Sequence, residues 1–393
     1  MSNRPVTEAH AGRMLLMANI TYWMAAGAYS PFLSAYLTAK GMTAAQIGLL
    51  LTLQPAATIL IQPLWARLSD RSGNRRLVLL LLTLGAAASS LLYERAGGFW
   101  SYFAATLAFT AFFSALLPLC DAIVIQGAAQ YHRDFARIRM GGTLGYALVV
   151  FLIGFYLDKT PTAQFTLVCA ACLILAFFEA MLPPVRQAEE EAPQGGEGGA
   201  ERRVFASREV VFVLAFAFIC QIGIGFSGSF LGRYVVELGY RQGLIGVLNC
   251  VSALSEVPIL LVASRITRRF GEIPILIFSG GMTGLRILLT GLGTVPAMVA
   301  AQLLQSVTYM TVYFCCATYI SRNVLPGRQS QGQSVLAVVQ TGFASVVANL
   351  GGGLAGDLLG IRQAYLLVAL LTAAGTAAVT LVYYRRRAAG DRG

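Results

Sequence analysis

The chain repeats one pattern of residues across its midpoint, inside strongly apolar segments. Corresponding residues keep a constant spacing, since 230 minus 32 and 271 minus 73 are both 198. The first copy is Phe32, Leu33, Tyr36, Gly41, Ile47, Gly48, Arg67 and Gly73, and the second is Phe230, Leu231, Tyr234, Gly239, Ile245, Gly246, Arg265 and Gly271. Two similar membrane halves in one polypeptide are typical of transporters that open alternately to either side. The pattern therefore predicts that function lies where the halves meet.

Composition predicts a membrane protein, because 56% of the 393 residues are hydrophobic and only 12% are charged. A soluble domain carries about 25% charge, and a spanning helix needs roughly 20 apolar residues. Twelve such segments are expected, at Met14–Leu37, Ala45–Arg67, Leu77–Tyr93, Phe99–Ala128, Arg139–Leu157, Thr162–Leu182, Val210–Gly232, Gly243–Ser264, Ile273–Leu292, Pro296–Ile320, Ser334–Leu359 and Tyr365–Tyr384. The first is too long for a signal peptide and has no small-residue cleavage site. We predict an all-α membrane protein with twelve transmembrane helices in two pseudo-symmetric six-helix bundles.

The net charge of +11 reflects the loops, and we expect no nucleic-acid partner. Arginines gather in the loops after even-numbered segments and in the C-terminal tail, whereas loops after odd-numbered segments hold few. Cytoplasmic loops retain Arg and Lys. The distribution predicts a multi-pass protein of the cell (inner) membrane with both termini cytoplasmic.

One low-complexity stretch separates the halves. It is rich in Gly, Glu and Pro and cannot bury a core, so we expect a flexible cytoplasmic linker. The predicted domains are a six-helix bundle at 1–183, the linker at 184–208, a second bundle at 209–384 and a basic cytoplasmic tail at 385–393.

Neither a metal site nor a cofactor is expected. All seven cysteines fall in apolar segments, and the Cys169–Cys172 spacing has no aqueous loop or second ligand pair beside it, so packing is the favoured role. The two histidines, His10 and His132, lie in aqueous segments. A buried histidine therefore cannot carry a proton in this chain.

Two blocks resemble the major facilitator superfamily, specifically its branch containing lactose permease and the phenylpropionate permease-like proteins. The loop from Asp70 to Arg76 reads Asp-Arg-x-Gly-x-Arg-Arg, the superfamily's signature, although Ala66 stands where Gly is usual. Residues 137–146 resemble the start of the fifth span in that branch. The resemblance covers all twelve spans and implies an alternating-access transporter.

The signature loop is expected to act as a cytoplasmic latch formed by Asp70, Arg71, Gly73 and Arg75. A carboxylate at Asp70 can face the positive N-terminus of a neighbouring helix, and the arginines can bind lipid phosphates. By resemblance, the latch steadies the conformation closed to the cytoplasm. The alternative is that the loop only fixes topology.

Ionisable side chains inside the bilayer cost roughly 3 kcal/mol each and so need a reason. Asp121 in span four and Arg139 in span five match, by separation, a carboxylate and an arginine that bind substrate in lactose permease-like proteins. Tyr146 matches an aromatic position that stacks on the sugar there. We predict that these three, with Tyr29 and Gln305, bind the solute. The alternative for Asp121 and Arg139 is a structural ion pair.

A second set of charges is expected to couple transport to protons. Arg286 matches the family's span-nine arginine, and its expected partner is Glu256 in span eight. A carboxyl that alternates between desolvation and an arginine takes up and releases a proton. Glu256 is the first candidate and Asp121 the second; a permanent helix-joining pair is the alternative. Where lactose permease has Lys, His and Glu in span ten, this chain has Gln302, Gln305 and Thr308, so lactose is not the expected substrate.

These features predict a proton-coupled symporter of a small polar organic solute, such as a sugar, glycoside, nucleoside or aromatic acid. The expected partners are the solute, the proton and the lipid bilayer, and we expect a monomer. The alternatives are an efflux antiporter of the same superfamily, a sensor that has lost transport, or a polytopic membrane enzyme. An enzyme is disfavoured because the spans hold no histidine and no acidic pair.

Overall fold

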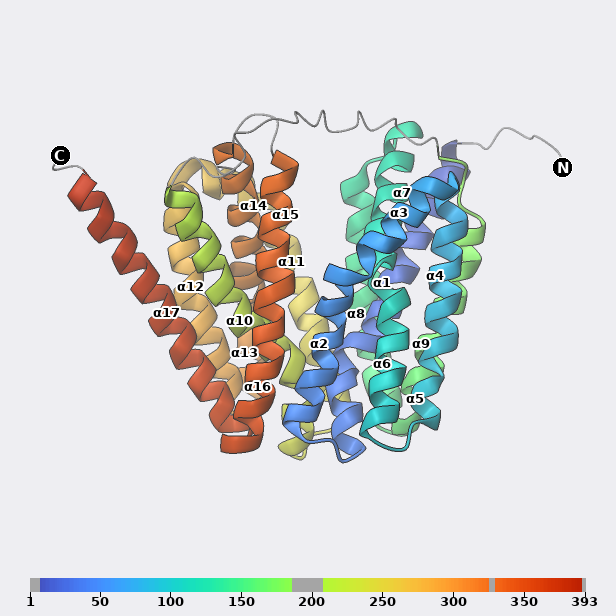
Figure 1. The fold of residues 1–393 in the computed structure, drawn as a ribbon, viewed down its shortest axis with the longest axis horizontal. Coiled ribbons are helices and arrows are strands. Elements are labelled where there is room, and N and C mark those ends of the chain that lie inside the picture. The colour runs from blue at the N-terminus through green and yellow to red at the C-terminus, as the bar shows by residue number, and fades with distance from the viewer. Residues whose placement is uncertain (1–7, 186–207, 325–328, 391–393) are drawn as a thin grey trace. The chain divides into compact units, whose positions relative to one another are not determined.

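The computed structural model describes residues 8–185, 208–324 and 329–390, which form helices joined by short turns (Figure 1). The helices of the first half are α1 (Glu8–Ala39), α2 (Ala44–Leu60), α3 (Gln62–Ser72), α4 (Arg75–Ser90), α5 (Leu92–Arg95), α6 (Phe99–Phe113), α7 (Leu116–Gln130), α8 (Phe135–Leu157), η1 (Pro161–Ala163) and α9 (Gln164–Ala180). Those of the second half are α10 (Arg208–Glu237), α11 (Gln242–Phe270), α12 (Glu272–Gly291), α13 (Val295–Leu303), η2 (Ser306–Met310), α14 (Thr311–Asn323), α15 (Gln329–Ala337), η3 (Val338–Ala344), α16 (Ser345–Leu359) and α17 (Ile361–Gly390). Of the predicted linker, residues 186–207 lie outside the described residues, as do 391–393 of the predicted tail.

Among the described residues, 11 helical stretches are long and apolar enough to cross a membrane. They coincide with the second to twelfth predicted segments. The first predicted segment lies in α1, a helix of 32 residues. Polar and amphipathic side chains such as Asn19, Tyr22 and Trp23 make α1 less apolar than the other spans.

Two predicted spans are broken by proline. The second divides at Ile61 into α2 and α3, and Pro63 stands in the first turn of α3. The fourth divides into α6 and α7, with Pro118 in the first turn of α7. Proline has no backbone N–H and its ring clashes with the carbonyl four residues earlier, so a continuous α-helix is interrupted at these points.

Two further spans contain π-helical turns. The tenth consists of α13, η2 and α14, and the eleventh of α15, η3 and α16, where η2 and η3 are π-helices. A π-helical turn adds a residue to the helical repeat and redirects the side chains after it, and such turns occur frequently at functional sites. In this chain η2 directly follows Gln305 and contains Thr308.

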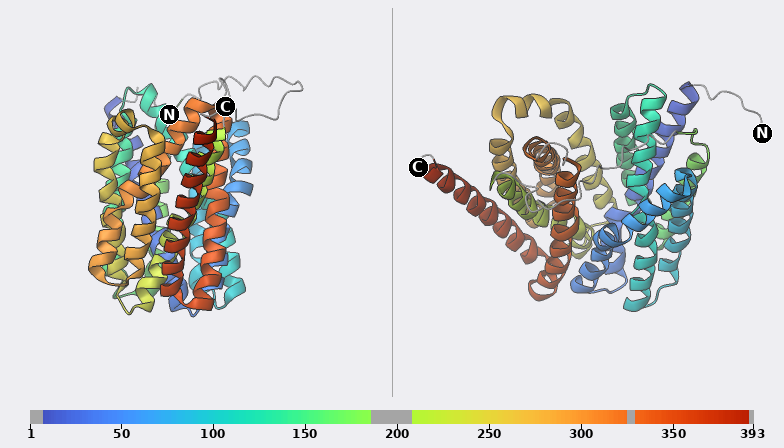
Figure 2. Two further views of the ribbon diagram at one scale, coloured as in Figure 1. Left: turned by 90° about the vertical axis from the view of Figure 1, so that its left-hand side faces the viewer. Right: turned by 45° about the horizontal axis from the view of Figure 1, so that its top comes forward.

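The chain forms two compact units, and the first comprises residues 1–36, 56–197 and 241–250. Within it, α4 packs against α9 and α6 (Figure 1, Figure 2). The rings of Tyr93 and Phe165 stack with centroids 3.8 Å apart at the core, and Tyr93 donates a hydrogen bond to the hydroxyl of Thr106. Unit 1 is therefore held together by buried aromatic rings whose polar ends are satisfied.

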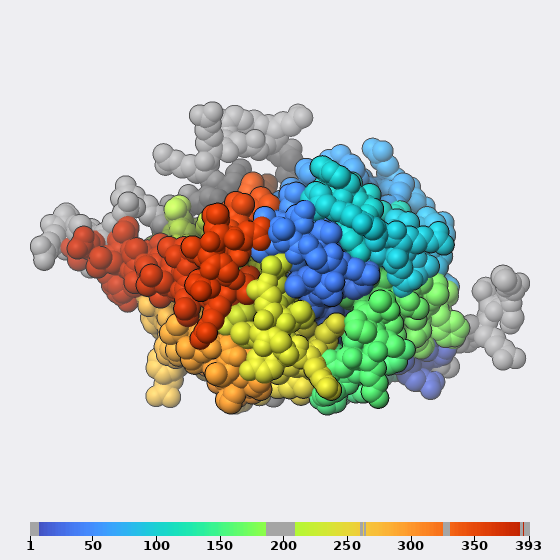
Figure 3. All heavy atoms as spheres, turned by 90° about the horizontal axis from the view of Figure 1, so that it is seen from below, coloured from blue at the N-terminus to red at the C-terminus, as the bar shows by residue number. Residues whose placement is uncertain are grey.

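The second unit comprises residues 37–55, 198–240 and 251–393. Within it, α12 packs against α17 and α10, and buried residues such as Phe216, Cys220 and Cys316 form a continuous core. The α12–α13 and α16–α17 turns come to the same end of this unit (Figure 3), where Arg362 donates a hydrogen bond to the carbonyl of Leu292.

The units do not follow the two sequence halves. The first turns of α2 belong to unit 2, where a Cβ added to Gly48 would lie 2.2 Å from the carbonyl oxygen of Asn349. The first turns of α11 belong to unit 1, where a Cβ at Gly246 would lie 2.5 Å from the carbonyl oxygen of Val150. Helices in membranes associate through small residues that let backbones approach. The predicted division at the linker stays a prediction.

Candidate functional site

In unit 1, the predicted solute-binding residues Asp121 and Arg139 lie on α7 and α8, and their charges interact. Both side chains are partly buried. The guanidinium of Arg139 lies over the ring of Trp23 on α1, 4.0 Å from its centroid. This cation–π contact holds the arginine flat against an aromatic surface. Three helices therefore bring a carboxylate, a guanidinium and an indole together.

Tyr146 extends this group along α8. Its ring meets the edge of Trp23 at 6.3 Å between centroids, and its hydroxyl donates a hydrogen bond to Oδ1 of Asn249 over 3.4 Å. Asn249 in turn donates to the carbonyl of Ile245. The structure therefore brings Asp121, Arg139 and Tyr146 into one cluster of unit 1.

Several buried polar atoms of this cluster have no hydrogen-bond partner within the described part of the chain. They are both amide atoms of Asn19, the indole Nε1 of Trp23 and Oδ1 of Asp121. Asn19 is 0% exposed. Buried polar groups are normally hydrogen-bonded, so each orphan group needs an explanation. A polar solute bound here would supply both donors and acceptors to these atoms.

The sequence reasoning missed Asn19 and Trp23. They lie four residues apart on α1 and so share one face of that helix. A Cβ at Gly142 on α8 would lie 2.4 Å from Oδ1 of Asn19 and 2.5 Å from Cδ1 of Trp23. An asparagine one turn from a tryptophan inside an apolar segment was the available signal.

Tyr29 lies elsewhere in unit 1. Its ring packs against Phe109 at 4.4 Å and Phe113 at 5.6 Å between centroids, and the side chain is 5% exposed. The amide of Gln164 donates a hydrogen bond to its carbonyl oxygen. These contacts place Tyr29 in the aromatic core, and its solute contact stays a prediction.

Glu256, the first candidate for proton coupling, and its expected partner Arg286 lie in unit 2. Gln305, which was predicted to bind the solute, lies there too, and its solute contact stays a prediction. Gln305 donates a hydrogen bond to Oε1 of Glu256 over 2.9 Å, which joins α11 to the start of η2. The remaining amide oxygen of Gln305 is buried without a partner among the residues described. Gln305, which stands where lactose permease has a charged or ionisable residue, therefore contacts Glu256, the candidate proton carrier, directly.

Arg286 on α12 is 7% exposed and makes two hydrogen bonds. It donates to the hydroxyl of Thr308 over 3.2 Å and to Oε1 of Gln302 over 3.1 Å. Its charge also interacts with that of Glu256. Span ten therefore accepts hydrogen bonds from Arg286 and donates one to Glu256, while Nε of Arg286 stays buried without a hydrogen-bond partner among the described residues.

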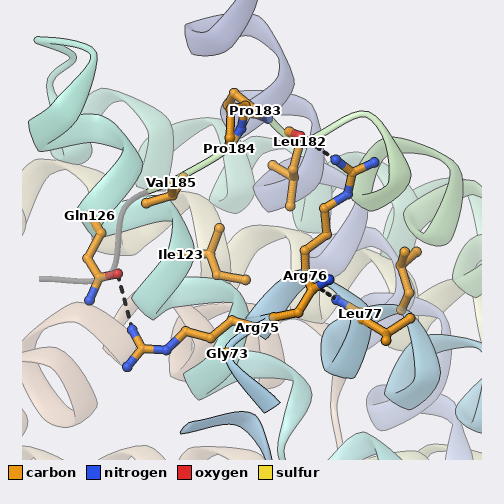
Figure 4. A pocket seen from close by; sticks show the side chains of 12 residues that line it. Gly73, Arg75, Arg76, Leu77, Ile123, Gln126, Leu182, Pro183, Pro184 and Val185 are labelled. Atoms are coloured by element: carbon orange, nitrogen blue, oxygen red, sulfur yellow. Dashed lines mark hydrogen bonds between the residues drawn. The ribbon is translucent and has the colours of Figure 1, made fainter. Parts of the chain in front are cut away.

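The predicted latch lies around a pocket of about 380 Å³ in unit 1 (Figure 4). Arg75 forms an ion pair of 3.2 Å with Asp70 and donates a hydrogen bond to Gln126, while Arg76 donates to the carbonyl of Leu182. Gly73 ends α3 with a φ of 62°, a left-handed conformation that glycine adopts at little cost. Arg71, on the last turn of α3, is exposed.

The described residues contain no group of three or more His, Cys, Asp or Glu side chains placed to hold a metal ion. All seven cysteines are free thiols.

The sequence matches the MFS_1 like family over residues 14–367. It is 27% identical over 385 residues to the maltose permease of Geobacillus stearothermophilus, covering 94% of both chains. It is also 27% identical over 324 residues to the probable 3-phenylpropionic acid transporter of Escherichia coli (strain K12), covering 79% of this chain and 82% of the relative. The solved structure of the nucleoside transporter NupG has the same fold, with a TM-score of 0.82 at 15% identity over 95% of this chain and 99% of that one.

These matches confirm the twelve-helix transporter fold and the superfamily predicted from the sequence motifs. The family match spans most of the chain, from α1 into α17. The chain therefore belongs to the MFS_1 like family and is a multi-pass membrane protein that acts as a secondary transporter of small solutes.

Proposed function

We propose that the chain is a proton-coupled symporter of a small polar organic solute that acts as a monomer in the inner membrane, with both termini cytoplasmic. The observation that carries the solute site is the set of unpartnered polar atoms around Arg139 in unit 1. Donors and acceptors without partners suit a solute with several hydroxyl or amide groups, such as a sugar, glycoside or nucleoside. The indole of Trp23 and the ring of Tyr146 would contact its apolar face.

The relatives support this range of solutes. They include a maltose permease, a probable 3-phenylpropionic acid transporter and a putative nucleoside transporter of Escherichia coli (strain K12). Of these solutes, an aromatic acid would pair its carboxylate with the guanidinium of Arg139.

Proton coupling is proposed for Glu256, with Asp121 as the second candidate. The hydrogen bond from Gln305 and the charge of Arg286 surround the Glu256 carboxyl with groups that a helix movement would change. One proton that moves through 100 mV releases about 2.3 kcal/mol, enough for roughly a 50-fold solute gradient. A single titrating carboxyl therefore suffices.

A thermal-shift screen tests the solute site. Sugars, nucleosides and aromatic acids are added to the purified protein, and a bound solute raises the melting temperature. Asp121→Ala and Arg139→Ala should each remove that rise. Arg137→Ala is the matched control, because its side chain is 85% exposed on the same helix. A rise that survives in both site variants would show that the solute binds elsewhere.

Transport in proteoliposomes tests coupling. An inward proton gradient should drive solute accumulation by the wild type, and Glu256→Gln should lose accumulation while it still exchanges solute across the membrane. Solute movement against the proton gradient would instead indicate an antiporter. The name of a relative, the multidrug resistance protein MdtG of Dickeya zeae (strain Ech586), 27% identical over 257 residues, is consistent with that alternative.

A further inference from the structure

Glu179, near the end of α9 in unit 1, has no place in the solute or coupling sites. Its side chain is 0% exposed, and neither carboxyl oxygen has a hydrogen-bond partner among the residues that the structure describes. Sequence reasoning did not select it, because it lies close to the end of its apolar segment. A buried carboxyl without partners is the most costly kind of polar group to retain in a membrane helix.

The groups around Glu179 cannot balance a negative charge. Thr83 on α4 approaches the carboxyl, but its hydroxyl donates its proton to the carbonyl of Leu79. The thiols of Cys120 on α7 and Cys172 on α9 are the other titratable groups that interact with it. An isolated ionised carboxylate costs many kcal/mol in such surroundings. The neutral, protonated acid is the form that this environment accommodates.

A pocket open to water lies one helical turn from this carboxyl. Three residues that line the pocket of Figure 4 lie three places along the chain from Glu179 and its neighbours. Leu80 is three from Thr83 in α4, Ile123 is three from Cys120 in α7, and Leu182 follows the end of α9, three from Glu179. Three residues of α-helix rise about 4.5 Å. Leu80, Ile123 and Leu182, called the floor here, are therefore the apolar pocket-lining residues that lie about one helical turn from Glu179 and its neighbours.

The pocket also holds the groups that would stabilise the ionised acid. Arg75 and Arg76 line it, and Arg76 donates its hydrogen bond to the carbonyl of Leu182 in the floor. The backbone N–H of Leu182 bonds to the carbonyl of Glu179 itself. A shift of this last turn of α9 would open the floor beside two guanidinium groups, whose positive charge favours a carboxylate.

We propose that Glu179 is a proton-binding site of unit 1, which holds a proton in this conformation and exchanges it with water that enters through the Arg75–Arg76 pocket. In the exchange, the carboxyl O–H bond breaks and its proton passes to a water molecule, which leaves a carboxylate beside the pocket. This site is separate from Glu256. The proposal does not depend on proton-coupled symport, because proton binding is measured without solute.

Infrared spectroscopy of the protein in lipid nanodiscs tests the proton at Glu179. A protonated carboxyl has a C=O stretching band that a carboxylate lacks. Glutamate in water is ionised above about pH 4.3, so a band at neutral pH identifies a retained proton. The wild type should show a band that Glu179→Gln lacks. Glu94→Gln, at an exposed glutamate of unit 1, should leave the band unchanged.

The exchange route is tested by transfer into D2O, which shifts the band as the carboxyl proton is replaced. Leu182→Ala thins the pocket floor and should make the shift several-fold faster than in the wild type. Met181→Ala is the matched control, since Met181 is 40% exposed and does not line the pocket.

The two experiments distinguish the protonation of Glu179 from the route of proton exchange. If the wild type and Glu179→Gln have the same carboxyl spectrum, Glu179 is ionised and the proposal is wrong. If the band is present but Leu182→Ala and Met181→Ala exchange at the wild-type rate, the route through the pocket is wrong. Glu179→Gln replaces a neutral acid with a neutral amide of the same shape, so its melting temperature should match that of the wild type. Failure of proton-driven transport in the wild type would refute symport and leave these results intact.

Discussion

The carboxylate of Asp357 in α16 accepts a hydrogen bond from the backbone N–H of Ala45 in α2 over 2.9 Å, and its other oxygen accepts one from Ala44 over 2.6 Å. Both N–H groups belong to the first turn of α2, where a helix leaves its donors unpaired. An acidic side chain from a distant segment therefore caps α2 in unit 2.

Asp158, which follows α8, makes the corresponding contact in unit 1 by accepting a hydrogen bond from the N–H of Gly243 over 3.0 Å. Gly243 lies 198 residues after Ala45, the spacing of the sequence repeat. A glycine precedes each aspartate by four residues, Gly154 and Gly353, and each packs directly on the backbone of the capped helix. The two halves of the sequence thus repeat a tertiary contact. In each, a Gly-x-x-x-Asp segment caps a neighbouring helix through its aspartate and packs on the backbone of that helix through its glycine.

Replacing either aspartate should destabilise the first turn of the helix that it caps. Asp357→Ala leaves two N–H groups of α2 without an acceptor, and the loss of a cap costs about 1 kcal/mol. Amide hydrogen exchange at residues 44–47 should therefore accelerate roughly fivefold, since about 1.4 kcal/mol corresponds to a factor of ten.

The repeat supplies the control for this experiment. Asp158→Ala should accelerate exchange at the start of α11 and leave the start of α2 unchanged, and Asp357→Ala should do the reverse. Uniform acceleration in both variants would mean that the aspartates stabilise the fold generally and do not act as caps.

The glycines of the same contact tolerate no side chain. A Cβ at Gly48 would lie 2.2 Å from the backbone oxygen of Asn349, which cannot rotate away. Gly48→Ala should therefore lower the stability by about 1–3 kcal/mol, the usual cost of overpacking. Thermal unfolding of the purified protein measures the loss.

Gly351→Ala on α16 is the comparison variant, because a Cβ there meets nothing within 4 Å. Alanine is also the better helix former, so Gly351→Ala should be neutral or stabilising. Equal melting temperatures for the two variants would contradict the close backbone contact at Gly48.

Features that depend on a short stretch of sequence were predicted, whereas features that depend on contacts between distant segments were not. The apolar segments were predicted because burying a helix in lipid requires a local run of apolar residues. Pro63 and Pro118 coincide with breaks in two of those segments, which the sequence did not predict. Proline alone does not decide a break, because Pro31, Pro55 and Pro258 lie inside continuous helices.

The site was predicted only in part. Asp121, Glu256 and Arg286 were selected because a charge inside an apolar run is conspicuous, and Arg139 because it matches a family position; their roles stay predictions. The stacking of Arg139 on Trp23 and the orphan atoms of Asn19 depend on how α1 and α8 pack, which no single segment specifies.

Arg286 should matter for the stability of unit 2. It is almost fully buried, and its guanidinium bonds to both Gln302 and Thr308. Lysine cannot place two donors in the same fork, and a buried hydrogen bond to a charged group contributes about 1.5–3 kcal/mol. Arg286→Lys should therefore destabilise the protein by about 2–3 kcal/mol in thermal unfolding.

Arg322→Lys provides the matched surface substitution. Arg322 forms an ion pair with Glu272, but its side chain is 65% exposed. Exposed pairs contribute about 0–1 kcal/mol, so this variant should melt within about 1 kcal/mol of the wild type. An equally small effect at Arg286 would show that its hydrogen bonds are replaceable by lysine.

Asp70 should affect the rate of transport more than stability or binding. Its side chain is 64% exposed and pairs with Arg75, which is itself bonded to Gln126. Because an exposed pair contributes little, Asp70→Asn should change the unfolding free energy by less than about 1 kcal/mol. In the predicted latch role, however, Asp70 is expected to stabilise one state of the transport cycle, so its loss should change how fast the states interconvert. Asp70→Asn should therefore bind solute with wild-type affinity and transport it several-fold more slowly.

Asp134→Asn tests the specificity of this effect, since Asp134 is also an exposed carboxylate paired with an arginine, Arg137. Asparagine also replaces Asp134 well as a helix cap. Wild-type transport by Asp70→Asn, or equal slowing by Asp134→Asn, would leave the loop as a topological signal only.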